Sequence, residues 1–236
     1  MIGSSARKSS AFDTFVPPAF GELHLWLCHR QQVSSSQSLC RDILAAYCGR
    51  QAKSLRLSRG EHGKPALAYP RGQLEFNMSH SADWLVLAVS TSGAVGVDLE
   101  YCAPDRDVMK LARRCYTPVE IAGLEACPPA ARVSRFYDYW TLKEARVKAL
   151  GASLAQELQA TGFSLEFPAV GQAGEIAVHS PTAERAWYGL LEPQPAYTLA
   201  LCCSAVDSAP WLQLRQWQGA GSHRVLPAML RAYSPT

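Results

Sequence analysis

The segment from Ala130 to Leu150 constrains the fold of this chain more than any other part of the sequence. It follows Pro128-Pro129 and ends at Gly151, and apolar residues recur along it at the spacing of one helical face. Proline before the first turn and glycine after the last turn are typical helix boundaries. The segment therefore predicts one long helix that buries one face. The residues of that face include Phe136, Tyr139, Trp140 and Val147.

Three shorter helices are predicted before this one. The first runs from about Ser38 to Cys48, where Gly49 provides a C-terminal cap. Asp105 can cap a second helix that extends to about Cys115. Residues 117–120 (TPVE) are a capping box with proline at the first helical position, which predicts the start of a third helix.

Short strand-like runs lie on both sides of the long helix. The runs before it are Glu22–Cys28, Ser54–Leu57, Leu74–Asn77, Trp84–Ser90 and Ala94–Glu100. The runs after it are Phe163–Phe167, Glu175–His179, Ala186–Leu191, Tyr197–Cys203 and Leu212–Trp217. The residues TSG at 91–93 predict a hairpin turn between the strands on either side.

Each half of the chain therefore offers helices and several strands, which predicts an α+β fold made of two similar halves. The expected boundary lies near residue 102, so that residues 21–101 form an N-terminal α+β subdomain and residues 102–236 a C-terminal one. Residues 1–20 carry an early Arg-Lys pair and Pro17-Pro18 but no apolar stretch. This composition indicates a flexible leader rather than a signal peptide.

The charge and hydropathy patterns argue against two classes of protein. The net charge of +3 over 236 residues is mildly basic, and the sequence has no dense stripe of Lys and Arg of the kind that binds nucleic acid. A local pocket for a small polyanion, or a docking face for an acidic partner, agrees better with this charge. No apolar run approaches the roughly 18 residues that a membrane-spanning helix needs.

The eight cysteines follow no metal-binding pattern. They stand at positions 28, 40, 48, 102, 115, 127, 202 and 203, and no two of them form a C-x2-C pair. Because no export signal is recognised, they are expected to be reduced and partly buried, as in a cytoplasmic protein.

Two carboxylates in the segment GVDLE are the first candidates for chemistry. On a strand, residues two apart project to the same side, so Asp98 and Glu100 point together while Val97 and Leu99 face the core. Neighbouring carboxylates repel each other, and a hard cation such as Mg²⁺ suits oxygen ligands of this kind. Taken alone, however, the pattern fits an acidic, solvated strand end better.

The segment WTLKEARVKA places Glu144 and Lys148 four residues apart on one face of the long helix. The functional interpretation makes Glu144 a third metal ligand or a general base, and Lys148 a phosphate-binding group. The structural interpretation is an exposed ion pair, which stabilises a helix by about 0.3–0.5 kcal/mol. The spacing by itself does not choose between the two.

Two further segments carry groups that bind phosphate. In EHGKP, a glycine-containing turn lets backbone amides approach an anion, and Lys64 adds positive charge. In FNMSHS, Ser79 and His80 stand at the end of a predicted strand and can donate hydrogen bonds. Taken alone, each segment is explained by a plain surface turn or by a structural histidine.

Together, HGKP, FNMSHS, GVDLE and W-x-x-K-E-x-x-x-K resemble the 4′-phosphopantetheinyl transferase superfamily, in its larger single-chain, surfactin-synthetase-activating (Sfp-type) branch. The resemblance is strong over about residues 53–150. It implies a pseudo-twofold pair of α+β halves with the active site in the cleft between them. It also implies an enzyme that transfers the 4′-phosphopantetheine group of coenzyme A to a serine of an apo acyl or peptidyl carrier protein, with release of 3′,5′-ADP.

The resemblance assigns roles to residues of this chain. Asp98, Glu100 and Glu144 match the ligands of a Mg²⁺ ion that links the halves and neutralises the pyrophosphate of coenzyme A. Lys148 matches the lysine that contacts the pyrophosphate, and Glu144 is also the candidate base for the attacking serine. Glu144 is therefore a ligand, a base or both. The residues that match the coenzyme A-binding set are Arg59, His62, Gly63, Lys64, Pro65, Ser79, His80 and Lys148.

Three alternatives remain open for the same residues. A metal-dependent phosphodiester hydrolase acting on a nucleotide-like diphosphate would use the three acids with water in place of serine. A serine hydrolase built on Ser79 and His80 is disfavoured, because neighbouring strand residues point opposite ways and the sequence has no G-x-S-x-G segment. A carrier-protein binder without activity leaves the acids and lysines unexplained.

The resemblance implies a cytoplasmic monomer and leaves the pathway open among fatty acid, polyketide and nonribosomal peptide biosynthesis. One region departs from the family pattern. Similar enzymes carry several basic residues before an arginine near the start of the first helix, whereas this chain has HRQQVSSSQSLCRD, with Gln37 in the place of the arginine. Arg30 and Arg41 are the available substitutes, so fewer charged contacts to the 3′-phosphate of coenzyme A are expected.

Overall fold

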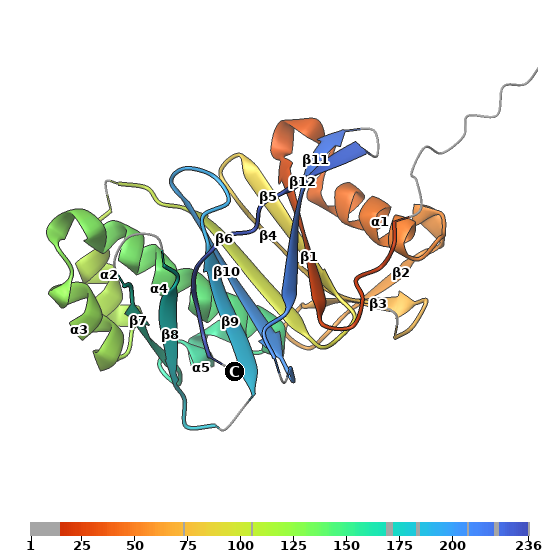
Figure 1. Ribbon diagram of the computed structural model, residues 1–236. Helices are drawn as coiled ribbons and strands as arrows, with labels where there is room; N and C mark the ends of the chain where they lie inside the picture. The colour runs from red at the N-terminus through yellow and green to blue at the C-terminus, as the bar shows by residue number, and fades with distance from the viewer. Residues whose placement is uncertain are drawn as a thin grey trace, which may run out of the picture.

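Two β-sheets with helices against them make up the protein, as the computed structural model shows (Figure 1). The structure describes residues 15–72, 74–104, 106–168, 172–182, 185–206, 208–219 and 222–235. Within these residues, no helix is long and apolar enough to cross a membrane. The mixture of sheets and helices confirms the predicted α+β class.

The first sheet combines strands from both ends of the chain. Its strands in the described residues are β1 Glu22–His29, β4 Glu75–Ser81, β5 Trp84–Ser90, β11 Trp211–Gly219 and β12 Ser222–Leu226. Their order across the sheet is β12-β11-β1-β5-β4. Strand β1 pairs antiparallel with β5 and parallel with β11, so the C-terminal part of the chain returns to the N-terminal sheet. A separate hairpin is formed by β2 Arg56–Arg59 and β3 Pro65–Tyr69.

The second sheet begins with the strand that carries GVDLE. Its described strands are β6 Val95–Tyr101, β7 Gly162–Glu166, β8 Gly174–His179, β9 Ala186–Leu191, β10 Tyr197–Ser204 and β13 Leu230–Tyr233. Their order is β6-β10-β9-β13-β8-β7. The hairpin predicted across residues 91–93 is wrong, because β5 pairs with β1 and β4 whereas β6 pairs with β10. This short connection instead carries the chain from one sheet to the other.

The helices agree closely with their predicted positions. They are α1 Ser36–Tyr47, α2 Val108–Cys115, α3 Pro118–Ala126, α4 Pro129–Leu150 and α5 Leu154–Glu157, with single 3-10 turns at Arg30–Gln32 and Ala52–Ser54. Helix α4 ends at Gly151, whose φ of 63° is left-handed, as expected for a glycine stop. The predicted capping box at α3 is confirmed, since Glu120 accepts from the Thr117 amide at 2.8 Å. Asp107 caps α2, whereas the predicted cap Asp105 lies outside the described residues.

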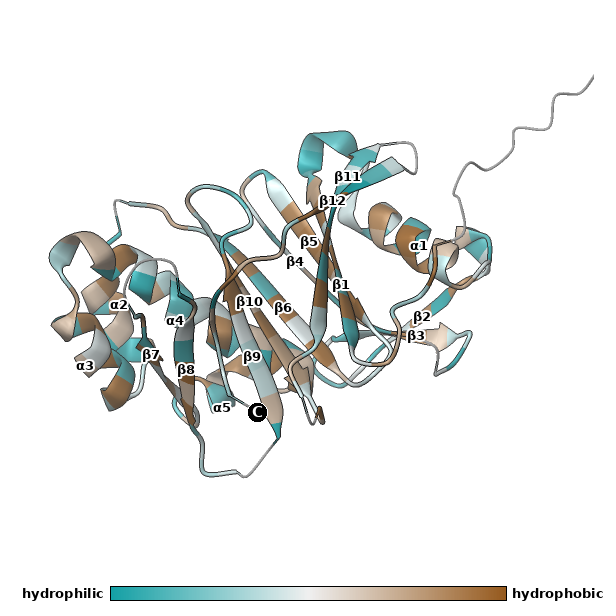
Figure 2. Cartoon of the chain, in the orientation of Figure 1, coloured by the Kyte–Doolittle hydropathy of each residue, from teal (hydrophilic) through white to brown (hydrophobic). Residues whose placement is uncertain are grey.

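Three hydrophobic cores hold these layers together. Helix α1 packs on one face of the first sheet, with Trp26 and Leu87 in that core. Helix α4 packs on the second sheet, with Tyr188 and Leu190 beneath it. The third core lies between the two sheets and joins residues of β1, β5, β6, β9 and β10. Hydrophobic residues accordingly concentrate in the strands and along α1 (Figure 2).

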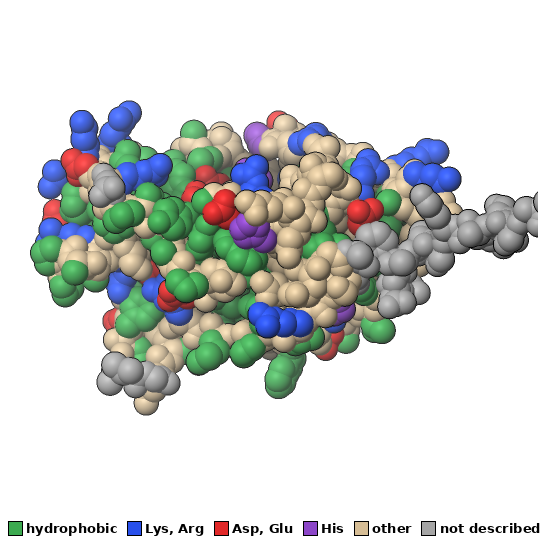
Figure 3. Space-filling model, turned by 90° about the horizontal axis from the view of Figure 1, so that it is seen from above, with side chains coloured by type: hydrophobic (Ala, Val, Ile, Leu, Met, Phe, Trp, Pro, Cys, Tyr) green, Lys and Arg blue, Asp and Glu red, His purple; other side chains and the backbone are tan. Residues whose placement is uncertain are grey.

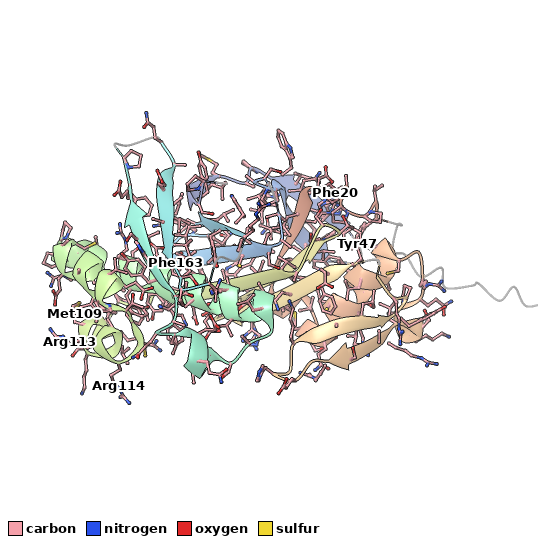
Figure 4. The ribbon with its side chains drawn as sticks, turned by 90° about the horizontal axis from the view of Figure 1, so that it is seen from below. Phe20, Tyr47, Met109, Arg113, Arg114 and Phe163 are labelled. Atoms are coloured by element: carbon pink, nitrogen blue, oxygen red, sulfur yellow. The ribbon has the colours of Figure 1, made fainter. Side chains whose placement is uncertain are left out.

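Helices α2 and α3 lie at the end opposite α1 (Figure 1). On the face drawn in Figure 3, Lys and Arg side chains gather mainly toward the two ends of the molecule. Arg113 and Arg114 of α2 project outward, whereas Phe163 lies inside the protein (Figure 4). None of the eight cysteines forms a disulfide, and four of them are buried.

The strand pairing cuts across the boundary expected near residue 102. Strand β6 precedes that boundary but belongs to the second sheet, while β11 and β12 follow it and belong to the first. Phe15, within the expected leader, is buried against Trp26 with the ring centroids 4.7 Å apart. Phe15 is therefore anchored in the first core although Val16 and Phe20 are exposed, and residues 1–14 lie outside the described part. The division into two halves related by a pseudo-twofold stays a prediction.

Candidate active site

Strand β6 directs its two acids toward helix α4. Val97 and Leu99 are fully buried in the core between the sheets. Because side chains alternate along a strand, Asp98 and Glu100 project from the opposite face, as the sequence predicts. Asp98 is only 3% exposed, whereas Glu100 is half-buried.

Gly96 lets α4 lie directly on this face of β6. A Cβ at that position would overlap the carbonyl oxygen of Ala145 and the amide nitrogen of Ala149, both in the helix backbone. No side chain fits there, so the glycine permits a close approach of strand and helix. The approach brings the last turns of α4 to Asp98. The close contact with α4, which also packs on β10, is consistent with the place of β6 in the second sheet.

Lys148 and Ser79 both bind the same oxygen of Asp98. The Lys148 ammonium donates to Asp98 Oδ1 at 2.6 Å and to Ser79 Oγ at 3.0 Å. The Ser79 hydroxyl in turn donates to Asp98 Oδ1 at 2.8 Å. Burial raises the pKa of Asp98, and the charge of Lys148 opposes this rise. The other oxygen, Asp98 Oδ2, is buried without a hydrogen-bond partner among the described residues.

Glu100 and Glu144 complete the acidic cluster. Ser81 Oγ donates to Glu100 Oε2 at 2.7 Å. Burial raises the pKa of Glu144, and the negative charge of Asp98 adds to this effect while Lys148 opposes it. Burial likewise raises the pKa of Glu100. A carboxylate with a raised pKa is a better proton acceptor, which is compatible with the expected role of Glu144 as a base.

A pocket of about 210 Å³ opens beside this cluster. The turn His62–Pro65 forms one wall, and the end of α4, at Lys148 and Gly151, forms another. Gly63 has a φ of 82°, a conformation that favours glycine and that shapes the turn. Lys148 lines the pocket and binds Asp98, so the pocket and the acids form one continuous site.

Lys64 connects the pocket wall to the helix. Its ammonium donates to the carbonyl oxygen of Ala149 at 2.7 Å, where α4 ends. A cation at this position is favoured by the negative end of the helix dipole. Burial lowers the pKa of Lys64. The sequence predicts this lysine as a phosphate-binding group, and the structure adds a contact that holds the turn against α4.

Three members of the predicted coenzyme A-binding set, Arg59, Ser79 and His80, are not among the residues that line the pocket. Ser79 nevertheless contacts the pocket residue Lys148. His80 is exposed, and strand alternation places it on the face of β4 opposite Ser79. Arg59 is exposed and donates to the carbonyl oxygen of Gly63 at 3.3 Å. The proposed substitutes for the missing arginine also bind carbonyl groups, Arg30 that of Ala82 and Arg41 that of Leu55.

Lys143 is a buried charge whose function the sequence did not reveal. It is 2% exposed, pairs with Glu120 at 3.0 Å and donates to the carbonyl oxygen of Thr161 at 2.6 Å. These contacts tie α4 to α3 and to the segment before β7. They fix the rotation of the helix and hence the direction in which Glu144 and Lys148 point.

Asn77 and Ser81 also contact β6 and were not singled out from the sequence. They alternate with Ser79 along β4, so all three side chains project to the same side. Asn77 Oδ1 accepts from the Val97 amide at 3.0 Å. The period-two pattern of polar residues in FNMSHS was the available signal, but it does not reveal which strand these residues meet.

The donor set of this site fits a hard divalent cation. The available ligands are carboxylate oxygens of Asp98, Glu100 and Glu144, and Asp98 Oδ2 is a buried acceptor with an unused lone pair. The ammonium of Lys148 lies beside Asp98. Within the described residues, no three carboxylate, imidazole or thiol groups converge as a ready-made metal site. A bound ion would therefore draw the acids together.

Comparisons with known proteins identify the family of the chain. The family model described as "4'-phosphopantetheinyl transferase superfamily" matches residues 94–202. A second model, "4'-phosphopantetheinyl transferase, N-terminal", matches residues 29–92. The two matches together span the hairpin β2–β3, the serines of β4, the acids of β6 and all of α4.

Three relatives illustrate the similarity. The chain is 34% identical to the 4′-phosphopantetheinyl transferase HetI of Nostoc sp. over 130 residues, 54% of this chain and 55% of that protein. It is 25% identical to the 4′-phosphopantetheinyl transferase Sfp of Bacillus subtilis, over 86% of this chain and 88% of that protein. It is 41% identical to the 4′-phosphopantetheinyl transferase AcpT of Escherichia coli, over 41% of this chain and 49% of that protein. The match thus spans about half the length of HetI and of AcpT, but most of Sfp. The chain belongs to the 4′-phosphopantetheinyl transferase superfamily.

Proposed function

We propose that this protein transfers the 4′-phosphopantetheine group of coenzyme A to a serine of an apo acyl or peptidyl carrier protein. One observation carries the proposal. Lys148 lines the pocket beside the HGKP turn and also binds the buried acid Asp98. A phosphate-binding pocket and an acidic cluster therefore share one residue, as a reaction at a diphosphate requires.

The diphosphate of coenzyme A is the group that fits the pocket. Lys64 and Lys148 line the pocket and supply positive charge. A phosphate oxygen in the pocket would accept a hydrogen bond from the Lys64 ammonium, either in place of the Ala149 carbonyl oxygen or together with it. Charge-assisted hydrogen bonds of this kind are about twice as strong as neutral ones.

The carrier serine would attack the phosphorus that bears the phosphopantetheine arm. A new bond forms from the serine oxygen to that phosphorus, and the bond to the oxygen of 3′,5′-ADP breaks. Glu144 takes the proton of the serine hydroxyl, and the burial that raises its pKa favours this role. Lys148 stabilises the charge that grows on the departing 3′,5′-ADP. A Mg²⁺ ion held by Asp98, Glu100 and Glu144 would neutralise charge on the diphosphate.

Three further properties belong to the proposal. The enzyme works as a monomer in the cytoplasm, acts without nucleic acid or membrane partners, and depends on Mg²⁺. Eight cysteines without a disulfide are compatible with a reducing compartment. The scattered positive side chains in Figure 3 offer no continuous stripe for nucleic acid on that face.

Intact mass spectrometry of several apo carrier proteins, incubated with coenzyme A, Mg²⁺ and the protein, tests the proposal. The expected result is a gain of one phosphopantetheine group, which Glu144→Gln loses and the surface control Glu125→Gln retains. Coenzyme A with the protein alone should release little 3′,5′-ADP. Rapid release without a carrier protein would instead establish a phosphodiester hydrolase, and unchanged carrier mass with every substrate would refute the transfer.

A further inference from the structure

The two sheets meet at an edge where no backbone pairing joins them. Strand β4 is the last strand of the first sheet, and β6 is the first strand of the second. The two strands contact each other, yet in the described residues each pairs only with its neighbour on the other side, β5 or β10. The edge amides of β6 therefore need other acceptors, because buried N–H groups are nearly always hydrogen-bonded.

Side chains provide these acceptors. Asn77 Oδ1 accepts from the Val97 amide at 3.0 Å, and Ser81 Oγ accepts from the Tyr101 amide at 3.0 Å. Two amides along this edge of β6 are thus satisfied by side chains of β4 and without a β-ladder.

Ser81 has two functions in this arrangement. Its oxygen accepts from the Tyr101 amide, so its single proton is left to donate to Glu100 Oε2 at 2.7 Å. This order of bonds holds Glu100 by one oxygen and leaves Oε1 available. Ser79 acts in the same way on Asp98, holding Oδ1 while Oδ2 has no protein partner in the described residues.

We propose that Ser81 is a positioning residue that orients Glu100 for a divalent cation, and that Asn77 fixes the edge of β6 beside Asp98. The inference rests on the proposed function, since it concerns the cation of that reaction. Partners of metal ligands typically contribute tenfold to a hundredfold to metal affinity, because they set the direction of the ligand. The Ser81 hydroxyl can orient Glu100 in this way because its bond to the Tyr101 amide restricts its rotation.

The test compares Ser81→Ala with Ser81→Thr, which keeps a hydroxyl, and with the control Ser164→Ala. Ser164 is also a strand serine with a hydrogen-bond partner, His179, but it lies on β7. The first readout is Mn²⁺ affinity of the coenzyme A-saturated protein, measured by electron paramagnetic resonance. Ser81→Ala should bind Mn²⁺ about tenfold or more weakly, whereas Ser81→Thr and Ser164→Ala should stay near the wild type.

The second readout needs neither metal nor coenzyme A. Hydrogen exchange of the free protein should accelerate at the Tyr101 amide in Ser81→Ala and at the Val97 amide in Asn77→Ala, each by about tenfold or more. Exchange in α1 and β13 should stay unchanged. Equal acceleration throughout the protein would indicate general destabilisation and would overturn the assignment.

The inference fails if Ser81→Ala matches the wild type in Mn²⁺ affinity, or if Ser81→Thr loses affinity as severely as Ser81→Ala. It also fails if the wild type binds no Mn²⁺ at all. Failure of the proposed function would be seen differently, as carrier proteins whose mass does not change with the wild-type protein. The two results are therefore separable.

Discussion

The ammonium of Lys148 lies 2.6 Å from Oδ1 of Asp98, across the contact between α4 and β6. The lysine side chain is 27% exposed and the aspartate side chain 5% exposed, so the pair joins the pocket to a buried acid. A phosphate bound in the pocket would compete with Asp98 for this ammonium.

The first prediction concerns the acid. Asp98→Asn should lower the transfer rate by at least about a hundredfold, because it removes the charge that a divalent cation needs. Its stability should change by less than about 1 kcal/mol, since the amide oxygen can still accept from Lys148 and Ser79. Steady-state kinetics and thermal unfolding check the two parts separately.

Two controls sharpen this prediction. A chelator should abolish transfer by the wild type, and added Mg²⁺ should restore it. Asp98→Ala should be less stable than Asp98→Asn, because it leaves Lys148 and Ser79 without their shared acceptor. Wild-type turnover by Asp98→Asn at saturating Mg²⁺ would show that the acid does not hold a catalytic cation.

The second prediction separates the two lysines of the pocket. Lys64→Met should weaken coenzyme A binding by roughly tenfold to a hundredfold with little change in kcat, the loss expected for one charge-assisted hydrogen bond. Lys148→Met should lower kcat as well, because its contact strengthens as the 3′,5′-ADP departs. Lys53→Met, at an exposed lysine on a 3-10 turn, is the control. Identical changes in KM and kcat for both pocket variants would contradict the separate roles.

The third prediction concerns the contact between strand and helix. Gly96→Ala should destabilise the protein by more than about 3 kcal/mol, because its Cβ meets backbone atoms of Ala145 and Ala149 that have no side-chain freedom to move. Gly60→Ala is the matched control, since the nearest atom to its Cβ is the Lys64 carbonyl oxygen at 3.8 Å. Urea unfolding measures both. If Gly96→Ala unfolds at the wild-type urea concentration, the close packing of α4 on β6 is refuted.

The fourth prediction concerns acid stability and a histidine outside the site. Burial and the nearby Arg215 lower the pKa of His24 from 6.5 to about 4, although Glu22 opposes the shift. Tyr47 contacts its Nδ1 at 2.7 Å, and His223 adds further positive charge when protonated. The folded protein thus holds His24 neutral in a pH range where the unfolded chain protonates it.

This difference in the pKa of His24 makes the folded protein less stable as the pH falls. The unfolded chain binds a proton as the pH falls through 6.5, while the folded protein does so only near pH 4. His24 therefore contributes full stability above pH 6.5, and the contribution is lost between pH 6.5 and 4. As the pH falls through this range, the free energy of unfolding should therefore decrease more steeply in the wild type than in His24→Gln. The difference in slope corresponds to the uptake of up to about one additional proton on unfolding. Parallel pH profiles in chemical denaturation would contradict the prediction.

Local patterns in the sequence were sufficient for the helices and for the direction of the acids. Helix α4, its glycine stop and the capping box of α3 depend on residues within a few positions of each other, so they could be predicted from spacing alone. The same holds for Asp98 and Glu100 sharing a face, since strand alternation is a local property. The four motifs also indicated the family before any contact was known.

The neighbours of each strand could be decided only by the tertiary structure. Residues 91–93 look like a hairpin turn, yet β5 and β6 enter different sheets, and β3, β12 and β13 were not predicted at all. Lys148 and Asp98 are 50 residues apart, and Ser81 and Glu100 are 19 apart. Their contacts depend on Gly96 admitting α4 and on β4 reaching the free edge of β6. Such contacts arise from packing between distant segments, so no periodicity within one segment can reveal them.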